Sequence, residues 1–278
     1  MISLRRFAAA VVLTLGFAAP ASAVTASPDF SDLWFNAAES GWGITFTQQA
    51  NTIFAAMYVY GTDGTPRWYV ATQMLSQPAA SGQFKYGGVL YATTGTYFGT
   101  IPFNPASTVA TPVGNMAITF SSSSAGTLIY DVGGVTITKP IVRQTFGTNS
   151  LAGGYFGGVA AVQNGCTTST SNGAAAYFLS SGVTVTHTNN VVAIRLDGVS
   201  GSTAVCNFSG TYTQTGRFGT ITAGIWSCTS STTIISSGTF SMTDVDVQTN
   251  GITATFTGAD NFCSSYVGRF GGLRLIGG

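Results

Sequence analysis

Hydrophobic and polar positions alternate with a period of two along most of this chain. Trp42, Ile44 and Phe46, for example, are each followed by Gly or Thr. This period is typical of a β-strand with one face buried. In the first half of the chain it predicts strands over 42–47, 51–60, 67–74, 84–91, 116–120, 128–132 and 135–142.

Turn-forming residues separate these runs at intervals of about 8–12 residues. Residues 61–66 include an Asp-Gly pair, 121–126 are mostly Ser, and Gly133-Gly134 lies between two runs. No helical period stands out beyond the N-terminal region. We therefore expect an all-β fold that begins with a small antiparallel up-and-down barrel or sandwich.

The second half has strand patterns of its own, separated from the first by a small, polar stretch near 147–154. Val183, Val185 and His187 share one face of a strand, and similar alternation follows in 240–247 and 252–256. We expect two domains: a barrel-like N-terminal domain over 24–147, and a disulfide-containing antiparallel β domain over 148–278. A single larger β structure is the alternative.

The N-terminus resembles a secretory signal. Arg5 and Arg6 precede an apolar run over 7–19, and 20–23 offer a small-residue cleavage site after Ala23. The run is too short to cross a bilayer. We expect residues 1–23 to be removed, leaving an exported chain with no membrane span. It would reside in the periplasm, at the cell surface or outside the cell.

All four cysteines lie in the second half. Four cysteines in an exported chain are expected to form two disulfides. Residues 216–219 lie midway between Cys206 and Cys228 and suit a hairpin turn, which would bring these two together. The pairing that remains is Cys166 with Cys263. The wide spacings match no zinc site.

Composition excludes several classes of protein. Only 7% of residues are charged, 36 of the 278 are Gly, and the formal charge is +1. Coiled coils need many more charged residues, and nucleic-acid surfaces need clustered Lys and Arg. We expect no nucleic-acid partner and no cofactor.

Catalytic and metal-binding candidates are few. His187 lies in a regular strand, and the chain contains no Gly-x-Ser-x-Gly motif for it to serve. Asp244 and Asp246 are two apart on a strand and so share a face. They are a weak calcium candidate, with ion pairing to Arg217 or Arg269 as the alternative. We expect a protein that is not an enzyme.

The most distinctive stretch runs from Asp32 to Gly43, where two Trp lie close to Asn and Glu. Aromatic faces stack on sugar rings or hold small apolar ligands, and Asn and Glu bind hydroxyls. The alternative is that the rings fill the core. The candidate ligand-binding residues are Trp34, Asn36, Glu39, Trp42, Trp68 and Tyr69.

This stretch also carries a resemblance. The run 36–43, Gln48-Gln49, and 60–68 are similar to a motif block of uncharacterised exported proteobacterial β-domain proteins, with Asn-x-x-Glu-Ser-Gly-Trp-Gly at its start. Ala37 stands where that block usually has Pro. A fainter likeness is to avidin-type barrels, which pair Gly and Trp on the first strand. The resemblance implies an exported bacterial β domain and transfers no activity.

We therefore expect an exported, non-catalytic binding or adhesion protein of the bacterial envelope, whose aromatic cluster recognises a glycan or a small apolar ligand. The main alternative is a structural or assembly subunit of the cell surface, since exposed strand edges favour self-association. A hydrolase and an outer-membrane barrel are the remaining alternatives. The sequence leaves the oligomeric state open.

Overall fold

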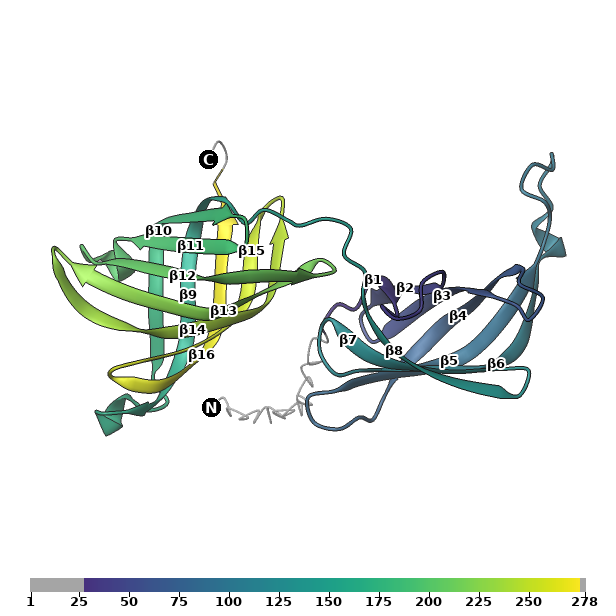
Figure 1. Ribbon diagram of the computed structural model, residues 1–278, viewed down its shortest axis with the longest axis horizontal. Helices are drawn as coiled ribbons and strands as arrows, with labels where there is room; N and C mark the ends of the chain where they lie inside the picture. The colour runs from purple at the N-terminus through teal and green to yellow at the C-terminus, as the bar shows by residue number, and fades with distance from the viewer. Residues whose placement is uncertain (1–27, 276–278) are drawn as a thin grey trace, which may run out of the picture.

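The computed structural model describes residues 28–275, so the expected signal peptide lies outside the described residues. The described chain is all-β and forms two closed antiparallel barrels of eight strands each (Figure 1). It contains no helix long and apolar enough to cross a membrane. The predicted fold class is confirmed.

Barrel 1 closes because its first and last strands pair. Each strand is hydrogen-bonded to the next in sequence, and β1 also pairs with β8, which makes an up-and-down barrel. Its strands are β1 (Asp32–Phe35), β2 (Gly43–Gln49), β3 (Thr52–Tyr60), β4 (Pro66–Gln77), β5 (Phe84–Thr94), β6 (Val109–Phe120), β7 (Ala125–Val132) and β8 (Val135–Arg143).

Barrel 2 repeats this topology, with β9 paired to both β10 and β16. Its strands are β9 (Gly153–Cys166), β10 (Ala175–Thr188), β11 (Val191–Asp197), β12 (Val205–Thr215), β13 (Phe218–Ser230), β14 (Thr233–Gln248), β15 (Gly251–Asp260) and β16 (Cys263–Arg274). The predicted domain boundary at 147/148 lies in the segment between β8 and β9.

Aromatic rings fill the interior of barrel 1. Phe30, just before β1, stacks on Phe120 of β6 with ring centroids 3.7 Å apart. Trp34 and Phe46 pack against the same Phe120 ring from β1 and β2. All four side chains are at most 1% exposed. The alternating pattern therefore directs its apolar members into the barrel.

Barrel 2 has its own core and carries both disulfides. Phe208, Phe240 and Phe256 form part of an aromatic cluster in its interior. Cys206–Cys228 joins β12 to β13, and Cys166–Cys263 joins β9 to β16. Both predicted pairings are confirmed. They lie at the end of barrel 2 opposite the 216–217 turn.

The two barrels share one construction at their first and last strands. Trp34 Nε1 donates to the carbonyl of Phe30, four residues earlier, at 3.0 Å. In barrel 2, Tyr155 donates from its hydroxyl to the carbonyl of Leu151, also four residues earlier, at 2.8 Å. The last residue of each closing strand is an Arg stacked on that ring: Arg143 on Trp34, Arg274 on Tyr155.

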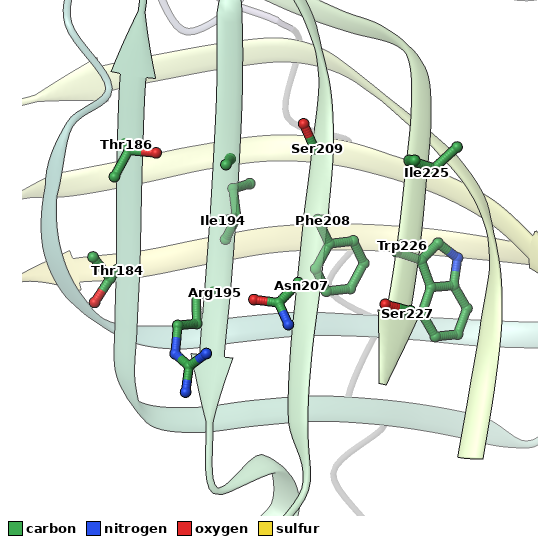
Figure 2. Close-up of a pocket in the computed structure, with 11 residues that line it drawn as sticks. Thr184, Thr186, Ile194, Arg195, Asn207, Phe208, Ser209, Ile225, Trp226 and Ser227 are labelled. Carbon is green, nitrogen blue, oxygen red and sulfur yellow. The ribbon is translucent and has the colours of Figure 1, made fainter. Parts of the chain in front are cut away.

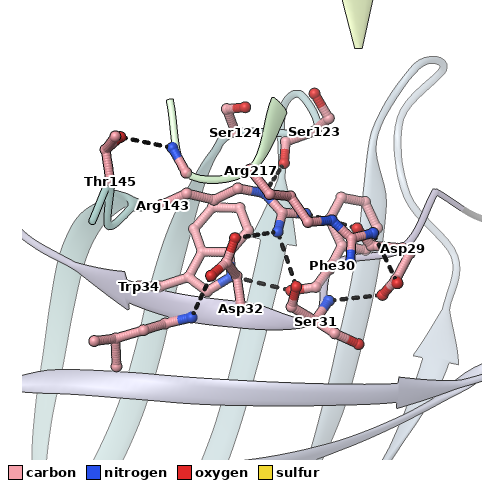
Figure 3. A network of polar contacts seen from close by, with 12 residues as sticks. Asp29, Phe30, Ser31, Asp32, Trp34, Ser123, Ser124, Arg143, Thr145 and Arg217 are labelled. Atoms are coloured by element: carbon pink, nitrogen blue, oxygen red, sulfur yellow. Dashed lines mark hydrogen bonds and ion pairs between the residues drawn. The ribbon is translucent and has the colours of Figure 1, made fainter. Parts of the chain in front are cut away.

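Arg143 also joins the two barrels (Figure 3). Its guanidinium lies between Trp34 and Phe218 of barrel 2, with 4.7 Å to each ring centroid. The side chain is fully buried and donates to Asp32 at 3.0 Å and to three backbone carbonyls. Beside it, Arg217 of barrel 2 pairs with Asp29 of barrel 1 at 2.8 Å.

The opposite end of barrel 1, here called the distal end, points away from barrel 2 (Figure 1). It carries the β1–β2 loop, the β3–β4 turn, the long β5–β6 connection and the β7–β8 turn. Most of the candidate residues at issue lie at or near this end.

Candidate functional site

The structure separates the six candidate residues into three groups. The first group, Trp34 and Asn36, stabilises the fold. Trp34 is fully buried in the core, where its ring packs between Phe46, Phe120 and Arg143. Asn36 is 9% exposed, and its side chain accepts from the backbone N–H of Ala38 at 3.0 Å. It shapes the β1–β2 loop. Their assignment as ligand-binding residues is not supported by this placement, because β1 directs Trp34 inward.

Glu39 and Trp42 do come together at the distal end. The indole Nε1 of Trp42 donates to a Glu39 carboxylate oxygen at 3.0 Å. The same carboxylate pairs with Lys139 of β8, whose Nζ lies 2.6 and 2.8 Å from its two oxygens. Tyr69 of β4 is half-buried and, like Trp42, packs against the barrel core. These residues hold the β1–β2 loop against β8.

The electrostatics of this group favour an ionised Glu39. Hydrogen bonds from Lys139, and then from Trp42, hold the pKa of the Glu39 carboxyl below its usual value. Nearby, burial raises the pKa of Tyr130, with the charges of Lys139 and Glu39 acting in opposite directions. An ionised carboxylate paired to a lysine accepts hydrogen bonds and does not supply a proton near neutral pH.

Trp68 faces the opposite way from its neighbour Tyr69, because successive strand residues alternate. Its side chain is 54% exposed on the outer surface of β4. Directly across on β3 lies Tyr58, 50% exposed, in register with it. Tyr60 and Phe54 continue the same outward series on β3. These four side chains, Phe54, Tyr58, Tyr60 and Trp68, are called the outer aromatic row.

The outer aromatic row reaches the distal end through Tyr60. A β-carbon placed on Gly41 would lie 3.5 Å from the Tyr60 ring, so this ring lies beside the β1–β2 loop. At the adjoining β3–β4 turn, Arg67 pairs with Asp63 at 2.8 Å. Flat apolar rings thus lie next to polar groups, an arrangement suited to a ligand with both kinds of surface.

Sequence reasoning missed Tyr58, Tyr60 and Lys139. The strand 51–60 reads as apolar on both faces, yet its outward positions are mainly aromatic and its inward positions aliphatic, as in Ile53 and Met57. That difference is the signal that would have found the row. Lys139 lies 100 residues from Glu39, and no local pattern connects them.

Asp244 and Asp246, the weak calcium candidate, do not lie on one face of a regular strand. A β-bulge falls between Thr243 and Asp246, and Asp244 takes a left-handed backbone with φ of 54°. Asp244 accepts from Ser123 of barrel 1, while Asp246 accepts from Gln248. The described residues hold no cluster of three or more His, Cys, Asp or Glu side chains. The alternative, ion pairing of these Asp residues with Arg217 or Arg269, is also wrong, since Arg217 pairs with Asp29 and Arg269 donates to Thr255.

His187 is half-buried at the end of β10, as its strand pattern predicts. Its Nδ1 accepts from the backbone N–H of Leu151 at 3.3 Å, and its ring packs edge-on against Tyr212. This histidine helps fix the start of β9 and contacts no nucleophile in the described part of the chain.

A shallow hollow of about 370 Å³ lies on the outer face of barrel 2 (Figure 2). Two rows of side chains in register across β10–β13 form its floor. One row is Thr184, Arg195, Asn207 and Ser227, and the other is Thr186, Ala193, Ser209 and Ile225. Arg195 is paired with Asp197 at 2.6 Å. The surface that lines the hollow is mostly apolar, because Ile194, Phe208 and Trp226 contribute to it as well, and no Asp or Glu is among its lining residues.

In comparisons of this chain with protein-family models, with curated proteins and with solved structures, no match was found. The likeness to exported proteobacterial β-domain proteins therefore stays a prediction from the motif block.

Proposed function

We propose that this chain is an exported, non-catalytic binding or adhesion protein of the bacterial envelope that recognises a glycan through the outer aromatic row. The observation that carries the proposal is the cross-strand pair of Tyr58 and Trp68, each about half exposed on the outer face of the sheet. Large exposed aromatics grouped on one surface mark interaction sites.

A glycan fits this surface better than a small apolar ligand does. Aromatic faces offer flat apolar area to the C–H face of a sugar ring, while neighbouring polar groups bind its hydroxyls. Asp63 and Arg67 at the β3–β4 turn supply such groups. A small apolar ligand would be expected inside the barrel, but Phe30, Trp34 and Phe120 occupy that space.

The chemistry of the charged groups supports a non-catalytic role. Glycoside hydrolysis requires a pair of carboxyl groups, one of them protonated. Glu39, the only Glu in the chain, is held ionised by Lys139 and Trp42. Nδ1 of His187 accepts a backbone hydrogen bond, so the neutral ring carries its proton on Nε2 and has no free lone pair with which to act as a base.

Two alternatives lose support from the topology. Barrel closure pairs β1 with β8 and β9 with β16, so the free strand edges that favoured an assembly subunit are occupied. In both barrels a cluster of buried apolar side chains fills the interior. An outer-membrane barrel has the reverse arrangement.

The test is a broad glycan-binding screen of residues 24–278 with both disulfides formed. The proposal predicts binding that Trp68→Ala abolishes and that a matched exposed substitution on barrel 2, Ile225→Ala, leaves unchanged. Circular dichroism of each variant shows whether the fold is retained. Binding that survives Trp68→Ala and Tyr58→Ala together, or no binding to any glycan, would contradict the proposal.

A further inference from the structure

The connection between β5 and β6 forms a projecting arm, residues 95–108, at the distal end of barrel 1 (Figure 1). It extends away from both barrels and ends in apolar side chains. Tyr97 is 67% exposed, Phe98 87%, Ile101 93% and Phe103 54%. Four large apolar side chains within seven residues are thus presented to solvent on a convex tip.

The arm carries no charge, and neither do the parts of β5 and β6 next to it. No Asp, Glu, Lys, Arg or His occurs from 86 to 130, a stretch that covers most of β5, all of β6 and most of β7. A tip of this kind can leave water without the desolvation penalty that a charged side chain imposes.

Some backbone polar groups of the arm form hydrogen bonds within the arm itself. Thr100 N–H donates to the Tyr97 carbonyl at 3.0 Å, and Asn104 caps the short 3-10 turn η1 (Pro105–Ser107) by accepting from Ala106 N–H. The Tyr97 and Phe98 rings lie against each other, 4.6 Å between centroids. Internal hydrogen bonds favour entry into an apolar medium, where unpaired backbone groups are costly.

We infer that the arm is a membrane-docking element whose tip enters the interfacial region of a lipid bilayer. Tyr and Phe are suited to this region, and Ile101 would reach the acyl chains. A second copy of the chain is a poorer occupant. Weighted by their exposed fractions, the four side chains of one tip offer roughly 450–750 Å². Two convex tips in contact can cover only part of this area, which falls short of the roughly 1,200–2,000 Å² of a stable interface.

The lack of charge makes the inference specific about the lipid. Basic segments bind anionic headgroups, and that binding weakens as salt rises. This arm has no basic residue, so its binding is expected to be the same on phosphatidylcholine vesicles with or without phosphatidylglycerol, and at low or high salt. Docking would place the distal end of barrel 1 on the membrane, with barrel 2 farther from it.

The experiment is flotation of residues 24–278 with phosphatidylcholine vesicles. Phe98→Asp together with Ile101→Asp is expected to weaken binding by at least about tenfold. The matched control replaces two exposed apolar residues of barrel 2, Ile225→Asp with Leu273→Asp, and should bind as the unaltered chain does. All proteins keep both disulfides and are checked by circular dichroism.

The depth to which the arm enters the bilayer is measured separately, with the variant Phe98→Trp. Brominated phosphatidylcholine should quench this added tryptophan beyond the quenching seen in the unaltered chain. Three outcomes would overturn the inference: no flotation of the unaltered chain, flotation that survives the two Asp substitutions, or concentration-dependent dimers in sedimentation that those substitutions abolish. The last would assign the arm to a second copy. Glycan binding at Trp68 is read out independently, so either proposal can fail alone.

Discussion

The guanidinium of Arg143 lies 4.7 Å from the ring centroid of Trp34, between the last and first strands of barrel 1. Arg274 lies 4.9 Å from Tyr155 at the matching place in barrel 2. The indole N–H of Trp34 and the hydroxyl of Tyr155 each also donate to a backbone carbonyl four residues earlier, that of Phe30 or Leu151. Both of these apolar residues are buried in their barrel. One device thus closes both barrels.

Replacement of Arg143 tests how much this device stabilises barrel 1. Arg143→Met leaves Asp32 and three carbonyls without their donor and removes the contact with Phe218. Removing one partner of a buried ion pair costs about 3–5 kcal/mol. We expect a loss of that size in the free energy of unfolding, measured in urea.

The control for Arg143 is Arg195→Met. Arg195 is half exposed and pairs with Asp197 on the surface of barrel 2. An exposed ion pair contributes about 0–1 kcal/mol. Equal losses for the two variants would show that burial of Arg143 between Trp34 and Phe218 adds nothing.

Gly216 tests the junction between the barrels. It has φ of 62°, and a β-carbon there would lie 2.5 Å from Cβ of Arg143. Gly216→Ala should cost about 2–4 kcal/mol, from backbone strain and overpacking together. Gly133→Ala is the matched control, because Gly133 has φ of 59° and open space around it. It should cost about 1 kcal/mol. Thermal denaturation compares them, and similar shifts would contradict the described contact.

The disulfides are expected to stabilise barrel 2 alone. Cys206–Cys228 spans 22 residues and Cys166–Cys263 spans 97. Chain-entropy estimates for loops of these lengths are about 3 and about 5 kcal/mol. Replacing the pair Cys206 and Cys228 with Ser should lower the unfolding temperature of barrel 2. With Trp226→Phe as the background, all remaining tryptophan emission comes from barrel 1 and should keep its own transition. A joint shift would indicate that the barrels unfold as one unit.

The contacts of Glu39 predict a dependence of stability on pH. Hydrogen bonds from Lys139 and Trp42 lower the pKa of Glu39 in the folded protein below its usual 4.5. These contacts therefore stabilise the fold fully above the unfolded pKa, and the contribution is lost as pH falls through the folded pKa. Glu39→Gln and Lys139→Met should each flatten the fall in unfolding free energy between neutral pH and about pH 3. An unchanged slope in both would contradict this role.

Much of the fold could be predicted from the sequence because strand alternation and turn residues are local signals. The expected strand 135–142 corresponds to β8 (Val135–Arg143), and 84–91 to β5 (Phe84–Thr94). The disulfide pairing followed from the turn at 216–217, which places Cys206 opposite Cys228 in register. β1 was missed because it has only four residues.

The candidate site was harder to predict because alternation gives relative faces but does not say which face is inside. Trp34 and Trp68 both lie on strands next to other aromatics, yet one is fully buried and the other is half exposed. The direction depends on barrel closure, which is a property of the whole sheet. The pairing of Glu39 with Lys139 depends on closure in the same way.

The most direct test of the central claim is the affinity of residues 24–278 for its best glycan ligand, measured by calorimetry for the unaltered chain, Trp68→Ala and Trp42→Phe. The outer aromatic row predicts that Trp68→Ala loses binding by at least about tenfold. Trp42→Phe should bind unchanged, because Trp42 packs against the core and donates to Glu39. Loss of binding in Trp42→Phe, with binding retained in Trp68→Ala, would contradict the proposal and move the site to the β1–β2 loop.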